Sequence, residues 1–217
     1  HYTKGVLMDE KLDNYLCAHS EEEPLLLQQL RRETYVKFLN PRMVSGHLQG
    51  RILVMFCKMI QAKRVLELGT FTGYSTLCFA EGTAPDAEIH SIEHNDEFED
   101  HHKDWFARSP YGDKIKMYYG DAKELIPSLE GTFDLIFLDH DKRQYKECYE
   151  MLLDKMHSGS FLLADNTLWN GKLFNEIAHN DSQSIAIAEF NDYLAKDSRV
   201  EKVMLPLRDG LTIIRKK

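Results

Sequence analysis

The stretch Arg64–Leu77 limits what this chain of 217 residues can fold into more than any other stretch does. Arg64–Leu68 is short, β-branched and apolar, which predicts a buried strand. Gly69–Gly73 predicts a tight turn bracketed by glycines, and the apolar face that begins at Tyr74 predicts a helix. A strand, a glycine turn and a helix in this order place free backbone N–H groups at the carboxyl edge of a sheet. That edge is where open α/β sheets bind ligands.

The chain after residue 60 repeats this alternation of strand and helix. The predicted strands are Arg64–Leu68, Glu88–Ile92, Ile115–Tyr119, Leu135–Leu138, Phe161–Ala164, Val200–Leu205 and Thr212–Arg215. The predicted helices are Tyr74–Glu81, Phe98–Ala107, Lys123–Leu129, Arg143–Met156 and Ser184–Leu194. Such alternation builds a parallel sheet, but the short loop Pro206–Gly210 joins the last two strands as an antiparallel hairpin. The predicted class is therefore α/β, with a mostly parallel sheet that contains one antiparallel strand.

Residues 1–60 predict a helical segment that precedes the sheet. Apolar residues at helical spacing indicate helices at Met8–His19, from Glu21 to about Leu39, and at Gly46–Ile60. Asn40 and Pro41 end the second of these helices. The length fits one domain, so we predict a single domain over residues 1–217, with residues 61–217 as its ligand-binding core.

The composition limits the partners and the location of the protein. A net charge of −8 argues against nucleic acid or an anionic membrane as the main partner. The four cysteines are scattered and form no C-x-x-C pair, which favours reduced thiols in a cytoplasmic protein over a zinc site or disulfides. No run approaches the ~20 apolar residues that span a bilayer. Residues 1–20 also contain no apolar core of a secretory signal.

The glycine turn differs from a dinucleotide-binding turn. That turn has the pattern G-x-G-x-x-G, whereas Thr70 and Phe71 stand here where a middle glycine would let a pyrophosphate approach. Glu67, just before the turn, would repel a pyrophosphate but is placed to hold an ammonium group, directly or through water. Glu93 ends the next predicted strand, where an acid can accept hydrogen bonds from both hydroxyls of a ribose. The turn therefore predicts a nucleoside-containing ligand without a phosphate at this point.

Acidic residues follow two further strands. Asp139 ends one strand, and Asp165 and Asn166 end the next strand along the chain. Neighbouring strands lie about 4.8 Å apart, so these side chains are predicted to converge. Two carboxylates and an amide oxygen suit Mg²⁺, Mn²⁺ or Ca²⁺ rather than zinc. His140 is a possible zinc ligand, but a lone histidine is more often not a ligand.

Several blocks in a fixed order together resemble the cation-dependent O-methyltransferases, the caffeoyl-CoA and catechol O-methyltransferase-like enzymes, especially their bacterial members. The blocks are Val65–Ser75, Glu93, Gly120–Ala122, Leu138–Lys142, Asp165 and Asn166 with Trp169, and Asp209–Thr212. Before the first strand, Met43, Ser45, Gln49 and Gly50 fit the same pattern. The resemblance implies a Rossmann-like class I methyltransferase fold with seven strands, helices on both faces, S-adenosylmethionine as donor, a divalent cation and a homodimer.

The resemblance also implies a role for each matching residue. Gly69, Thr70 and Phe71 would line the methionine part of S-adenosylmethionine, with Ser75 near its carboxylate, Glu93 on the ribose, Asp121 and Ala122 beside the adenine, and Met43 and Ser45 closing over the cofactor. Asp139, Asp165 and Asn166 would hold the metal, with Asp139 also beside the cofactor, Lys142 would be the general base, and Trp169 would touch the substrate.

The implied reaction is methyl transfer to a hydroxyl of a small aromatic vicinal diol, catechol-like or caffeoyl-like. A metal-bound diol oxygen becomes more acidic and can attack the methyl group in line. His140 and Asn170 stand where the family more often has small residues, which leaves the identity of the substrate open. Two alternatives remain: a nicotinamide-dependent oxidoreductase and a non-catalytic protein that binds S-adenosylmethionine.

Overall fold

The computed structural model describes residues 10–217. Its helices are α1 (Glu10–Ala18), α2 (Leu25–Lys37), α3 (Gly46–Ile60), α4 (Tyr74–Gly82), α5 (Glu99–Ala107), α6 (Ala122–Leu125), α7 (Tyr145–Leu153) and α8 (Ser182–Lys196). Its strands are β1 (Arg64–Leu68), β2 (Glu88–Glu93), β3 (Ile115–Tyr119), β4 (Phe133–Leu138), β5 (Met156–Asp165), β6 (Val200–Leu205) and β7 (Leu211–Lys216). Short 3₁₀ turns include Pro41–Met43, Lys142–Gln144 and Trp169–Phe174.

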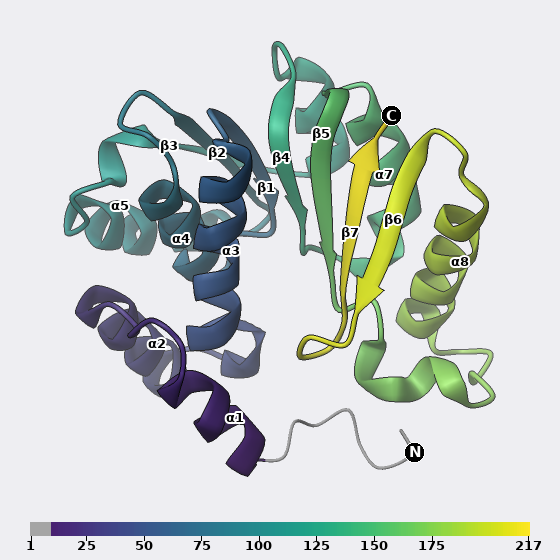
Figure 1. The fold of residues 1–217 in the computed structure, drawn as a ribbon, viewed down its shortest axis with the longest axis horizontal. Coiled ribbons are helices and arrows are strands. Elements are labelled where there is room, and N and C mark those ends of the chain that lie inside the picture. The colour runs from purple at the N-terminus through teal and green to yellow at the C-terminus, as the bar shows by residue number, and fades with distance from the viewer. Residues whose placement is uncertain (1–9) are drawn as a thin grey trace.

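The strands form one sheet in the order β3-β2-β1-β4-β5-β7-β6 (Figure 1). Strands β1 to β5 pair in parallel, and β7 runs antiparallel to both of its neighbours, β5 and β6. The predicted seven-stranded, mostly parallel sheet with one antiparallel strand is therefore confirmed. The order reverses between β1 and β4, so the carboxyl ends of these two strands flank the crevice where such sheets bind ligands.

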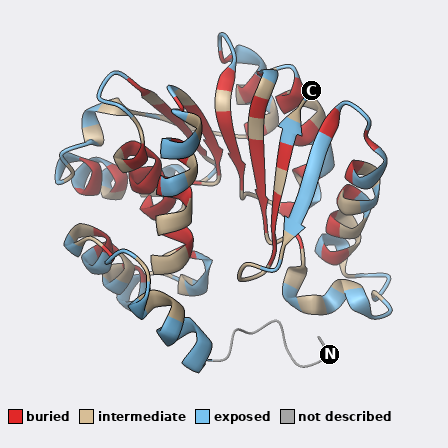
Figure 2. Cartoon of the chain, viewed as in Figure 1, coloured by how far each residue is buried: buried red, intermediate tan, exposed pale blue. Residues whose placement is uncertain are grey.

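Helices cover both faces of this sheet. Alternate residues of a strand point to opposite sides, and apolar side chains on each side pack against helices. Leu66, Ile136 and Leu162 pack with α6, α7 and α8 on one face. Val65 and Leu135 pack with α3, α4 and α5 on the other face. Figure 2 shows the central strands largely buried, the edge strand β6 largely exposed, and helices whose outer faces are exposed. This double burial explains why the central strands are continuous apolar runs rather than alternating ones.

Several helix boundaries differ from the prediction, and two of these differences have a clear structural cause. The predicted helix Arg143–Met156 is shorter, because α7 ends at Leu153 and Met156 already begins β5. The start of β5 is hidden in the sequence by polar residues: the Ser160 hydroxyl donates to the Phe133 carbonyl at 2.7 Å and accepts from the His157 amide at 3.0 Å. The predicted helix Lys123–Leu129 is divided into α6 and a 3₁₀ turn that contains a proline.

The N-terminal helices lie against the α3 and α4 side of the sheet (Figure 1). The buried Glu23 carboxylate accepts from the Tyr74 hydroxyl at 2.7 Å and forms an ion pair with Arg31, which ties the start of α2 to α4. The Thr34 hydroxyl donates to that of Thr72 at 2.9 Å, which ties α2 to the glycine turn. The predicted start of the first helix at Met8 lies outside the described residues. Within residues 10–217, none of the helices combines the length and apolar character that a bilayer crossing demands.

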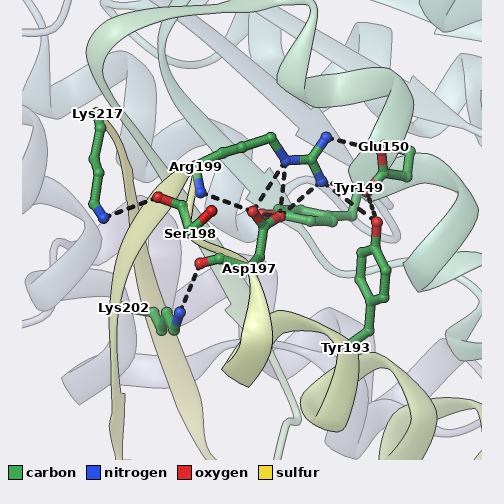
Figure 3. Close-up of polar contacts among 8 residues, drawn as sticks. All are labelled: Tyr149, Glu150, Tyr193, Asp197, Ser198, Arg199, Lys202 and Lys217. Carbon is green, nitrogen blue, oxygen red and sulfur yellow. Dashed lines mark hydrogen bonds and ion pairs between the residues drawn. The ribbon is translucent and has the colours of Figure 1, made fainter.

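A polar network joins α7, the end of α8 and the start of β6 (Figure 3). The Asp197 carboxylate, whose side chain is 4% exposed, accepts from the Tyr149 hydroxyl at 2.8 Å and from the Arg199 guanidinium at 2.7 Å. The Arg199 guanidinium holds the pKa of Asp197 well below its usual range. Glu150 completes the network with a 2.7 Å contact to Arg199.

Replacing Asp197 by alanine should lower the free energy of unfolding by roughly 2–4 kcal/mol, because the buried Tyr149 hydroxyl loses its acceptor. The loss should begin to shrink below about pH 4, where the Asp197 carboxylate becomes protonated in the unfolded wild-type chain while Arg199 keeps it ionised in the folded one. Urea denaturation at pH 7 and at pH 3 measures both effects. Glu201→Ala is the matched control, since its ion pair with Arg215 is exposed and should cost less than about 1 kcal/mol. Equal losses for the two variants would contradict this prediction.

Candidate active site

The crossing point of β1 and β4 brings the glycine turn against Asp139. The Asp139 amide donates to the Leu68 carbonyl at 2.9 Å. Gly69 has a φ of 95°, and a Cβ on it would lie 2.0 Å from the Asp139 carbonyl oxygen. Only glycine fits this position, because a side chain would have to occupy the same space as the neighbouring backbone. The first glycine of the turn is thus required for the close approach of the two strands.

A cleft of about 1490 Å³ opens at this edge of the sheet. The predicted site residues that line it are Met43, Gly69, Phe71, Glu93, Asp121, Ala122, Asp139, Lys142, Asp165, Asn166 and Trp169. Ser45, Thr70 and Ser75 line a small adjoining pocket together with Gly69 and Asp139. Glu67 lines neither space. The fold therefore brings residues from far apart in the chain together at one edge, whereas Glu67 lies behind the turn.

The backbone of the glycine turn is held from two sides. One oxygen of the Glu93 carboxylate accepts from the Thr70 amide at 3.1 Å and from the Phe71 amide at 2.8 Å. On the other side, His102 contacts the Phe71 carbonyl at 2.6 Å and His101 contacts the Thr72 carbonyl at 3.1 Å. Since a carbonyl only accepts, both histidines present an N–H group here. Side chains therefore hold the turn from both sides, and the other Glu93 oxygen accepts from the Asn95 amide at 3.0 Å.

Glu67 is completely buried in β1. Its carboxylate accepts hydrogen bonds from the hydroxyls of Ser75, Thr76 and Ser91, the last at 2.6 Å. Burial raises the pKa of Glu67 to about 7, although the three hydroxyls oppose this rise. The side chain therefore holds the helix start and the neighbouring strand in place. Its predicted contact with an ammonium group would have to run through a hydroxyl such as that of Ser75.

Replacing Glu67 by glutamine should change how stability depends on pH. Between pH 4.5 and pH 7 the unfolded wild-type chain loses the Glu67 proton while the folded chain keeps it, so the wild-type protein loses stability as pH rises through this window. Glutamine does not titrate. The difference in the free energy of unfolding, variant minus wild type, should therefore rise by on the order of 3 kcal/mol and level off above pH 7. Denaturant unfolding at several pH values in this range measures this difference, with Glu176→Gln at an exposed position as the control. A difference between Glu67→Gln and wild type that does not change with pH would refute the raised pKa of Glu67.

Lys142 lies on the floor of the cleft, in the 3₁₀ turn after β4. Its ammonium group is buried and donates to Asp139 Oδ1 at 2.8 Å and to the Tyr145 hydroxyl at 2.7 Å. The Tyr145 hydroxyl in turn lies 2.9 Å from the carbonyl oxygens of Leu138 and Asp165. Burial raises the pKa of Tyr145 well above its ordinary value, so this phenol stays neutral. Lys142 is thereby fixed in one position beside Asp139.

The carboxylates of Asp139 and Asp165 face the same part of the cleft, because Leu138 and Ala164 are paired in the sheet. Burial raises the pKa of Asp139, and the charge of Asp165 raises it further against the lowering effect of Lys142. No cluster of three or more His, Cys, Asp or Glu side chains in residues 10–217 is arranged to hold a metal. The predicted set contains two carboxylates, and the amide of Asn166 is its third oxygen donor. This all-oxygen set fits a hard divalent cation.

The prediction assigned no role to several residues that organise the site. Gln49 donates to Asp165 Oδ2 at 2.8 Å, and 116 residues separate the two, so no local pattern reveals the contact. Tyr145 stands three residues after Lys142 on a helix start, a spacing that places them on one face and could have been used. His140 is packed on Tyr145 with its Nε2 3.3 Å from the Cys148 sulfur, which disfavours the zinc-ligand alternative.

Comparison with known proteins agrees with this geometry. Residues 17–217 match the model of a protein family described as O-methyltransferase. The chain belongs to the O-methyltransferase family. This O-methyltransferase is 31% identical to a caffeoyl-CoA O-methyltransferase of Populus kitakamiensis, over 98% of its own length and 96% of the relative's. It is 32% identical to the Eucalyptus gunnii enzyme of the same name, with 98% and 90% coverage.

Solved structures resemble this O-methyltransferase along nearly its whole length. SAH-bound PaMTH1, a methyltransferase of Podospora anserina, superposes with a TM-score of 0.88 at 29% identity, covering 96% of this chain and 94% of the other. The O-methyltransferase TomG of Streptomyces achromogenes superposes with a TM-score of 0.86 at 24% identity, with 95% and 96% coverage, and shows the common fold. The predicted family, the Rossmann-like methyltransferase fold and the assignment as an enzyme are confirmed. The oxidoreductase alternative has no support in these matches.

Proposed function

We propose that this O-methyltransferase transfers the methyl group of S-adenosylmethionine to one hydroxyl of a small aromatic vicinal diol, of the catechol or caffeoyl type, with the help of a divalent cation. The observation that carries the proposal is the position of Lys142 and Asp139 between the glycine turn and the Asp165–Asn166 pair, all in one cleft. The cleft would thus have a donor half around the glycine turn and an acceptor half around Asp139, Asp165 and Asn166, which adjoin each other.

The donor half contains groups suited to a nucleoside linked to an amino acid. Glu93 is held by the glycine turn and offers carboxylate oxygen to a ribose, while Asp121, the N-cap of α6, and Ala122 lie beside the expected adenine. Ser45 and Ser75 line the adjoining pocket, where they suit the amino-acid end. The names of the structural relatives agree with this assignment, because PaMTH1 was solved with SAH bound.

The acceptor half contains Asp139, Asp165 and Asn166 as the residues that would hold the cation. A bound divalent cation would make a coordinated hydroxyl more acidic and fix its orientation. Lys142 lies beside Asp139 and would, as the neutral amine, take the hydroxyl proton, while Trp169 and the loop after it would shape the space for the ring. Alignment of the two reacting groups would supply much of the remaining rate.

A methyl-transfer assay with labelled S-adenosylmethionine tests this proposal. Incubation with a panel of catechols, caffeate and caffeoyl-CoA, with and without Mg²⁺, should transfer label to vicinal diols in the presence of the cation. Chelator should abolish transfer. Binding of SAH without transfer to any member of the panel would favour a non-catalytic binding protein, and binding of NAD in place of SAH would overturn the proposal.

A further inference from the structure

The loop between β6 and β7 reaches across the cleft. In Figure 1 this loop lies at the lower edge of the sheet, between the start of α3 and the segment that leads into α8. Arg208 in this loop has a φ of 49°, in the left-handed region that residues other than glycine, asparagine and aspartate rarely adopt. Such a conformation is unfavourable for an arginine and persists only where the surroundings hold it. The contacts of the Arg208 side chain show what holds it.

The Arg208 guanidinium binds the segment that is expected to cover the donor. It donates to the Ser45 carbonyl, to Gln49 Oε1 at 3.2 Å and to the Arg42 carbonyl at 3.3 Å. Met43, inside this segment, lines the cleft. The Arg208 side chain therefore forms hydrogen bonds with three residues of the segment from Arg42 to Gln49.

Gln49 continues this contact to the expected cation site. Its amide oxygen accepts from Arg208, and its amide nitrogen donates to Asp165 Oδ2 at 2.8 Å. Both Gln49 and Asp165 are buried, with 1% and 4% of their surfaces exposed. The other Asp165 oxygen accepts from the backbone N–H of Asn166 at 2.8 Å. Because Arg208 fixes which end of the Gln49 amide faces Asp165, it orients a carboxylate that it does not touch.

The same loop also holds the segment expected to contact the acceptor. The Leu168 amide donates to the Asp209 carbonyl at 2.8 Å, and the Asn170 amide donates to the Asp209 carboxylate. The Thr167 amide donates to the Gly210 carbonyl at 3.3 Å. Trp169 lies between these anchored residues. The β6–β7 loop is thus bonded to the donor cover and to the acceptor loop at once.

We propose that Arg208 is a positioning residue that couples the donor site to the cation site through Gln49 and Asp165. The inference rests on the proposed function, since it concerns the same two halves of the cleft. Closure of the Arg42–Gln49 segment over the donor aligns Gln49, and Gln49 then holds Asp165 in the orientation that binds the cation. The coupling acts in both directions, so a bound cation also strengthens donor binding.

Calorimetric titration of the whole chain with SAH, with and without Mn²⁺, measures this coupling. The wild-type protein should bind SAH at least about fivefold more tightly when Mn²⁺ is present. Arg208→Gly removes the guanidinium and suits the positive φ, so the variant should fold and its coupling should fall below about twofold. Gln49→Leu should lose the coupling in the same way while Arg208 is intact. Arg215→Gln, which alters an exposed arginine of β7, is the matched control and should keep the wild-type coupling.

The outcomes separate this inference from the proposed function. A wild-type protein that binds both SAH and Mn²⁺ without mutual effect overturns the inference and leaves the proposed function in place. Wild-type coupling in both Arg208→Gly and Gln49→Leu also overturns it. A wild-type protein that binds neither SAH nor Mn²⁺ overturns the proposed function, and the inference with it. Loss of coupling in both variants, with the control unchanged, supports the inference.

Discussion

Lys142→Arg is expected to lower the turnover of methyl transfer about 10²- to 10⁴-fold, which is the range that a general acid–base residue contributes. Arginine keeps a positive charge that can pair with Asp139, as Lys142 does at 2.8 Å. A guanidinium does not release its proton in proteins, so it cannot accept one from a hydroxyl. The substitution therefore removes the base while retaining the ion pair. Single-turnover measurement with saturating donor and diol gives the chemical step directly.

The control for this experiment is Lys146→Arg, four residues further along and exposed on α7. That variant should keep the wild-type rate, because Lys146 stacks on Tyr193, away from the cleft. SAH affinity should stay within about threefold of wild type in both variants, which would confine the loss to the chemical step. A wild-type rate in Lys142→Arg would exclude Lys142 as the base.

The sequence predicted the sheet well because its signals are local. The strand at Arg64–Leu68, the turn glycines and the acids at strand ends are each recognisable within a few residues, and parallel pairing then brings Glu93 and Asp139 to one edge. The early start of β5 at Met156 was missed, because its first residues are polar and are held by Ser160 rather than by an apolar pattern. Tertiary hydrogen bonds override propensity there.

The parts of the site that escaped prediction are those that depend on contacts across the chain. Arg208 meets Ser45 over 163 residues of sequence, and nothing around either residue indicates the other. Glu67 was predicted as a ligand contact because it stands next to the turn, but strand alternation turns its side chain into the protein, where three hydroxyls bind it. Position next to a functional turn therefore does not decide whether a side chain faces the ligand.

Asp139→Asn is expected to weaken Mn²⁺ binding about 100-fold or more and to reduce cation-dependent turnover by a similar or larger factor. The substitution preserves shape but removes one of the two carboxylate charges that a divalent cation would meet beside Asn166. Backbone contacts between β4 and the glycine turn should survive, because they involve the Asp139 amide and carbonyl rather than its side chain. SAH binding in the absence of metal should therefore change by less than about threefold.

Manganese binding by electron paramagnetic resonance and SAH binding by calorimetry test this prediction independently of turnover. Asp154→Asn, an exposed position after α7, is the matched control and should bind Mn²⁺ like the wild-type protein. Retained Mn²⁺ affinity in Asp139→Asn, or turnover that persists in chelator, would show that Asp139 holds no cation. Loss of SAH binding with Mn²⁺ binding retained would instead assign Asp139 to the donor site alone. The two titrations thus decide which half of the cleft this carboxylate serves.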